Sequence, residues 1–191
     1  MMHIYQLRDL PVSRWRNGGG ETREIVRFPG GEDGFGWRAS IATIAASGAF
    51  SSFPGADRVI TLLQGDGVEL EFAGKPSHVL RVNRPLRFAG EESVYARLSG
   101  APSLDFNIMT ARDRFNADVC VTDRAQRAES GVAWIIAGQW RAAGKRLTAG
   151  QGAWWLRNGE AIVPHSSDAR MLFTRITARH QVCPDAARPN G

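Results

Sequence analysis

The feature that most constrains the fold is a run of short apolar segments separated by tight turns. Between Arg58 and Leu98 such segments recur at regular spacing, at residues 58–63, 68–72, 79–82, 86–88 and 94–98. Segments of this length and spacing predict the strands of a β-sandwich or barrel. Helix-length periodic segments are scarce, and the 21 glycines and nine prolines imply many turns. The sequence therefore predicts an all-β fold.

The second half of the chain repeats this pattern imperfectly. Val132–Ala137 parallels Val59–Leu63, and a Gly-Lys turn follows in both halves, at Gly74-Lys75 and Gly144-Lys145. A chain of 191 residues is long enough for two small packed units. We expect two related β-barrels packed together. The first spans residues 1–115, the smaller second spans residues 116–183, and residues 184–191 form a flexible tail.

A glycine-rich stretch, WRNGGGETREI, runs from Trp15 to Ile25. Three consecutive glycines permit backbone shapes closed to other residues and let a ligand or another strand approach. An aromatic residue, an amide and both charge signs surround them, which is unusual for a linker. Two interpretations stay open at this point: a turn or bulge between two strands, and a backbone exposed for ligand contact.

Two predicted strands carry polar side chains on one face. In Trp37–Ala45 the alternation makes Arg38 and Ser40 project together, and in Leu104–Met109 it does the same for Asp105 and Asn107. On an outer face these side chains would meet solvent. Inside a barrel mouth they would need partners, because an unpaired buried polar group costs roughly 1–3 kcal/mol. Arg38 and Arg58 are the candidate partners for Asp105 and Asn107.

A loop with few charges, Gly48–Arg58, contains Phe50 and Phe53 in an otherwise turn-like sequence. We expect it to fold back over apolar core or over a binding pocket.

Charge and cysteine content exclude several classes of protein. The net charge is +5, but the arginines are scattered rather than clustered in the stripe typical of nucleic-acid binding. The N-terminus has no apolar signal segment and no apolar run approaches membrane-spanning length. Cys120 and Cys183 have no metal-ligand spacing; a disulfide between them stays open, although free thiols are favoured. We expect a cytoplasmic protein without nucleic-acid or membrane partners.

The four histidines, His3, His78, His165 and His180, form no metal-ligand pattern. A set of histidine and carboxylate ligands cannot be drawn from their spacing. We expect neither barrel to use a metal or another cofactor.

Taken together, these residues make the chain resemble the HutD/Ves family, whose fold is a bicupin. The matching stretches are WRNGGGETREI, WRASIATI, GAFSSFPGADRVITLLQGDGVEL, PLRFAG and SLDFNIMTAR, which cover nearly all of the first half. The second half matches mainly in strand pattern, with GVAWIIAG as its clearest segment.

The resemblance implies two cupin-like (jelly-roll) β-barrels in one chain. It also implies a part in bacterial histidine utilisation, namely binding a pathway intermediate such as N-formylglutamate and restraining the pathway. Carried onto this sequence, the ligand-facing candidates are Trp15, Asn17, Gly18, Gly19, Arg38, Ser40, Phe50, Ser51, Arg58, Asp105 and Asn107.

Three functions follow from these residues. The favoured one is a metal-independent binding module, in which Arg38 and Arg58 clamp a small carboxylate. The second is a metal-independent isomerase or hydrolase, with Asp105 or Glu24 as general base. The third is an interaction scaffold whose arginine and aspartate faces form salt bridges in a homodimer. A closed ion-pair network of Arg38, Arg58, Asp105 and Asn107 that only stabilises the barrel is the structural alternative.

Overall fold

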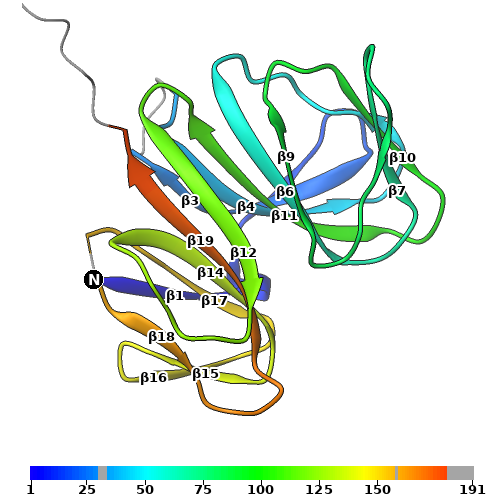
Figure 1. Cartoon of the computed structure of the whole chain (residues 1–191). Coiled ribbons are helices and arrows are strands. Elements are labelled where there is room, and N and C mark those ends of the chain that lie inside the picture. Colours follow the sequence, from blue (N-terminus) through cyan, green and yellow to red (C-terminus); the bar gives the residue numbers. More distant parts are fainter. Residues whose placement is uncertain (30–33, 158, 180–191) are drawn as a thin grey trace, which may run out of the picture.

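The computed structural model describes residues 1–29, 34–157 and 159–179 (Figure 1). Regular structure within these residues consists of strands and one single-turn 3₁₀ helix, η1 (Leu7–Asp9). The all-β prediction is therefore confirmed. The predicted tail, Cys183 and His180 lie outside the described residues.

Two antiparallel sheets form the first barrel. The large sheet has six strands in the order β2 (Val12–Arg14), β3 (Gly20–Phe28), β4 (Trp37–Ile44), β11 (Ser103–Ala111), β6 (Ala56–Gln64) and β9 (Pro85–Ala89). The small sheet has the order β5 (Gly48–Ala49), β10 (Val94–Leu98), β7 (Val68–Phe72) and β8 (His78–Val79).

The second barrel is built in the same way. Its large sheet has the order β1 (Met2–Gln6), β17 (Gln151–Trp155), β14 (Ser130–Ala137), β19 (Arg170–Ala178) and β12 (Phe115–Thr122). Its small sheet has the order β13 (Gln126–Arg127), β18 (Ala161–Pro164), β15 (Gln139–Ala142) and β16 (Lys145–Thr148).

The strand orders show that the internal repeat extends over eight strands. The order β4-β11-β6-β9 recurs as β12-β19-β14-β17, and the order β5-β10-β7-β8 recurs as β13-β18-β15-β16. Each set is an eight-stranded double sheet of the jelly-roll type. The remaining strands are additions: β2 and β3 extend the first large sheet, and β1 extends the second.

The two large sheets pack against each other through a shared core. Trp37, Ile41 and Phe106 from the first barrel lie in one buried cluster with Trp134 and Leu172 from the second. Side chains alternate between the two faces of each large sheet. One face of each sheet therefore enters the shared core, and the opposite face lines the interior of its own barrel. Figure 1 shows β12 and β19 running between the two barrels.

The structure differs from the sequence-based expectations at three elements. The first strand, β1, pairs with β17 in the second barrel, although residues 1–115 were expected to form the first. The predicted strand at 79–82 is reduced to β8, and a turn follows. Residues 111–116 were expected to lead into the second unit and no element was assigned to residues 117–122, whereas β12 spans Phe115–Thr122, because Ala117, Val119 and Val121 alternate inward onto the shared core.

No helix in the described part of the chain has the length and apolar character needed to cross a membrane.

Candidate functional site

A cavity of about 590 Å³ opens into the first barrel. Polar residues from the large sheet form its floor, and the β2–β3 turn and the loop after β5 form its walls. The lining residues are Ser13, Arg14, Trp15, Arg16, Asn17, Thr22, Arg38, Ser40, Ala42, Ala49, Phe50, Ser51, Phe53, Arg58, Asp105, Asn107 and Met109. Nine of the eleven candidates from the sequence are among them.

Strand register explains why distant residues meet here. Met109 on β11 lies opposite Arg38 on β4 and opposite Arg58 on β6, so the three side chains form one row across the sheet. Asn107 lies opposite Ser40 in the next row of the same face. The predicted alternation of β4 and β11 is confirmed, because the apolar residues between these positions enter the shared core.

Arg58 is a buried cation that no carboxylate of the described residues pairs with. Its side chain is 6% exposed, and its guanidinium carbon lies 4.9, 5.2 and 5.5 Å from the ring centroids of Phe88, Phe50 and Phe53. Nη1 donates a hydrogen bond to the Ser51 carbonyl oxygen at 3.3 Å, whereas Nε has no partner. Burial lowers the pKa of Arg58 to about 10, an effect that Asp105 opposes and Arg38 adds to.

Asp105 and Asn107 form a buried polar pair on β11. The Asn107 Nδ2 donates a hydrogen bond to Asp105 Oδ2, while Asp105 Oδ1 has no partner. Burial raises the pKa of Asp105 to about 7, against the lowering effects of the Asn107 hydrogen bond and the Arg58 charge. Neither Arg38 nor Arg58 forms an ion pair with Asp105, so the closed network considered above does not exist.

Arg38 has a different partner. Its Nε lies 2.6 Å from Oε2 of Glu24 on the adjacent strand β3, and Arg27 approaches the same oxygen at 3.4 Å. Arg38 therefore has a carboxylate beside it, which it shares with Arg27, whereas no carboxylate of the described residues pairs with Arg58. The two arginines, which the sequence treated as equivalent clamps, are inequivalent in the structure.

The glycine-rich stretch is the turn between β2 and β3. Trp15 N donates to Gly20 O at 2.9 Å, and Gly18 N donates to Trp15 O at 3.0 Å. Gly19 N donates to Asn17 Oδ1 at 3.0 Å. Gly18 and Gly19 do not line the cavity, and their N–H groups are used within the turn. The expectation that they supply backbone donors to a ligand is therefore not supported by their geometry.

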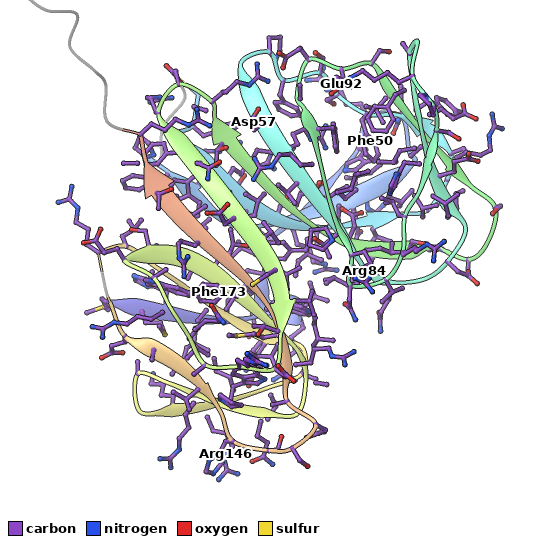
Figure 2. All side chains as sticks on the ribbon, viewed as in Figure 1. Phe50, Asp57, Arg84, Glu92, Arg146 and Phe173 are labelled. Carbon is purple, nitrogen blue, oxygen red and sulfur yellow. The ribbon has the colours of Figure 1, made fainter. Side chains whose placement is uncertain are left out.

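This turn places the aromatic wall of the cavity. The Trp15 indole N–H donates to Thr22 Oγ1 at 2.8 Å, and its ring meets Phe50 edge-on at a centroid distance of 6.5 Å. The loop after β5 folds back as expected, and Figure 2 shows Phe50 within the first barrel. Phe53, Met109 and Ala42 also line the cavity but were not among the candidates from the sequence. The apolar composition of the loop pointed to Phe53, and the alternation of β4 and β11 placed Ala42 and Met109 on the same face as the polar candidates.

The second barrel has no such polar floor. Each repeat has a β-bulge at the same place, with Leu63 as the extra residue in β6 and Ile136 in β14, opposite Leu104/Asp105 of β11 and Arg170/Met171 of β19. Aligning the repeats on these bulges sets Asp105 against Met171 and Asn107 against Phe173. Met171 and Phe173 are fully buried in an apolar cluster with Trp140 and Trp155, and Figure 2 shows Phe173 inside this barrel. Apolar side chains therefore occupy the positions that bear the polar pair in the first barrel.

Across residues 1–29, 34–157 and 159–179, no three His, Cys, Asp or Glu side chains are grouped to hold a metal ion. The polar groups of the cavity are instead four arginines, one carboxyl, amides and hydroxyls. These groups suit hydrogen bonding and charge pairing with an organic anion.

Comparison with known proteins agrees with this architecture. The HutD family model matches residues 7–173. The chain is 44% identical to Protein Ves of Citrobacter koseri over 191 residues, which covers 98% of this chain and 100% of that protein. The structure of HutD from Pseudomonas fluorescens SBW25 superimposes with a TM-score of 0.84 at 32% identity, covering 94% of this chain and 100% of that one.

A cupin 2 conserved barrel domain protein from Leptotrichia buccalis shares the fold alone, with a TM-score of 0.63 at 10% identity over 92% of this chain and 96% of that one. The fold is thus a bicupin, and the protein is of the cupin-like class. The chain belongs to the HutD family.

Proposed function

We propose that the first barrel binds a small carboxylate metabolite without a metal, and that N-formylglutamate is the candidate ligand. The observation that carries this proposal is the buried guanidinium of Arg58 on the cavity floor, whose Nε lacks a hydrogen-bond partner and which pairs with no carboxylate of the described residues. A buried charge without a partner is costly. A ligand carboxylate would supply that partner through charge-assisted hydrogen bonds, each contributing roughly 1.5–3 kcal/mol.

The surroundings of Arg58 support binding of an anion in a fixed position. Three aromatic rings surround its guanidinium group, which restricts the directions left for hydrogen bonding. Arg14 and Arg16 add positive charge at the more exposed wall. Asn107 and Ser40 offer an amide and a hydroxyl that suit a carbonyl or formamide group.

Family membership supports the cellular role that we propose, which is to sense an intermediate of histidine utilisation and restrain the pathway. The structure of HutD from Pseudomonas fluorescens SBW25 is of a formate condition. Formate is the smallest carboxylate. We place the protein in the cytoplasm, where such an intermediate would be found.

An enzyme on the same scaffold is the second candidate, because the pKa of Asp105, about 7, suits a general acid or base. The scaffold alternative loses its main support, since Arg58 and Asp105 are too buried to form salt bridges between subunits. A homodimer built on other surfaces stays a prediction.

Calorimetric titration of the full chain with N-formylglutamate tests the proposal, with proton NMR of the same mixture to detect turnover. We expect saturable binding and an unchanged ligand spectrum. Product formation would favour the enzyme. If neither N-formylglutamate nor glutarate binds, the proposal is wrong.

A further inference from the structure

Asp105 is the one acidic side chain among the lining residues, which include four arginines. It is 1% exposed, one of its oxygens is held by Asn107, and the other has no partner. An ionised carboxylate in such a place would need several donors or a cation in contact. It has a single donor, and burial accordingly raises its pKa to about 7.

The charged groups on the side of Asp105 come from β6, β4, β3 and the β2–β3 turn. Arg58 projects from β6, Arg38 projects from β4, and Arg14 and Arg16 lie beside the β2–β3 turn. Glu24 on β3 is paired with Arg38 and Arg27. From β9 the nearest contribution to this face is the uncharged Phe88, because Arg87 alternates outward to Asp57, 3.9 Å away.

We propose, on the basis of the function above, that Asp105 binds the ligand in its protonated form, donating a hydrogen bond from Oδ1 to a ligand oxygen. Anion binding at Arg58 is then accompanied by the uptake of one proton from solvent by Asp105. No covalent bond to carbon forms or breaks, and the proton returns to solvent when the ligand leaves.

The electrostatic reason is that two anions would otherwise share one cavity. A ligand carboxylate near Arg58 disfavours ionisation of Asp105, just as two carboxyl groups in one site share a proton. A neutral Asp105 also restricts the class of ligand. It has no negative charge to balance the ammonium group of a free amino acid, which the four arginines of the cavity would repel. The site therefore selects carboxylates that lack a free amino group, such as N-acylated amino acids, over free amino acids.

Titration calorimetry of the full chain with N-formylglutamate tests this at several pH values between 6 and 8.5, in phosphate and in Tris. The ligand carboxylates stay ionised throughout this range. From the dependence of heat on buffer, we expect uptake of about half a proton at pH 7 and nearly one at pH 8.5. Affinity should fall by up to about tenfold per pH unit above the pKa of the free site.

Asp105→Asn should bind with no proton uptake from this site and with an affinity that is flat over the same range. Asp118→Asn, on the exposed side of β12, is the matched control and should behave as the parent. Free glutamate should bind at least tenfold more weakly than N-formylglutamate to the parent.

Binding without proton uptake in the parent overturns this inference and leaves the proposed function intact, whereas absence of binding overturns the proposed function. If Asp105→Asn does not fold, infrared difference spectra of the parent decide the matter. A protonated-carboxyl band that gains intensity on binding supports the inference, and its absence contradicts it.

Discussion

Glu24 and Arg38 lie on adjacent strands with Oε2 and Nε 2.6 Å apart, which places a carboxylate beside one of the two arginines on the cavity floor. Arg58, in the same row of the sheet, has aromatic rings rather than a carboxylate around it. The cavity floor thus holds one arginine with a carboxylate beside it and one without, and under the proposed function Arg58 is the arginine that binds the anion.

Replacing Glu24 with glutamine should strengthen carboxylate binding, because Arg38 would then also carry an unbalanced charge. We expect N-formylglutamate affinity to rise about three- to tenfold, the size of a moderate charge-pair change near a surface. Titration calorimetry measures it. Glu71→Gln, which breaks the exposed pair with Arg97, is the control with no effect. Weaker binding by Glu24→Gln would mean that Glu24 itself positions Arg38 for the ligand.

Arg58→Met should remove most of the carboxylate affinity while preserving the apolar contacts with the phenylalanine rings. Loss of one charge-assisted hydrogen bond predicts a decrease of roughly tenfold to a hundredfold. Arg97→Met, on the outer surface of the same barrel, should bind as the parent does. Equal affinities for Arg58→Met and the parent would show that the anion lies elsewhere.

Asp105→Asn should stabilise the protein increasingly as pH rises. The pKa of Asp105 is about 7 in the folded chain, above the value of about 3.9 for an unfolded one. Ionisation therefore favours unfolding, and stability is lost as pH rises from about 4 to about 7. Denaturant unfolding of the variant and the parent at several pH values measures this. The stability difference should change by up to about 1.4 kcal/mol per pH unit across that window and level off above it.

Gly20→Ala should destabilise the β2–β3 turn, because a Cβ there would lie 2.2 Å from the Thr43 carbonyl oxygen and 3.0 Å from the Trp15 ring. We expect a loss of about 1–3 kcal/mol in thermal unfolding and weaker ligand binding through displacement of Trp15. Gly18→Ala meets no atom within 4 Å but keeps a φ of +72°, so its cost should be about 1 kcal/mol. Equal effects of the two substitutions would contradict this account of the turn.

Phe106→Ala should destabilise both barrels at once. Phe106 is fully buried in the core that the two large sheets share, and truncation of such a side chain costs about 3–5 kcal/mol. Scanning calorimetry should show one transition at a lower temperature. Two separate transitions would show that the shared core does not couple the barrels.

The sequence predicted most of the cavity floor because strand alternation is a local property. Arg38 and Ser40, like Asp105 and Asn107, are two residues apart on strands whose other face is apolar. Phe53 was visible only as an unusual residue in a loop, and its contact with Arg58 depends on how that loop folds back.

The remaining features depend on pairing between distant strands, which a single sequence does not contain. The register of β3 against β4 brings Glu24 to Arg38, and nothing near either residue indicates it. For the glycines, the sequence indicated the conformational freedom of the backbone correctly but not its purpose. We expected their backbone to contact a ligand, whereas Gly18 and Gly19 use their N–H groups inside the turn.

The pairing of β1 with β17 has a consequence for how the chain is made. Residues 2–6 are synthesised long before their partners, residues 151–155. Strand β1 therefore stays without this partner until β17 has been made. A cut after residue 115 would separate this strand from its sheet, so the C-terminal fragment would expose the edge of β17 to other molecules. In the intact chain, β1 covers that edge.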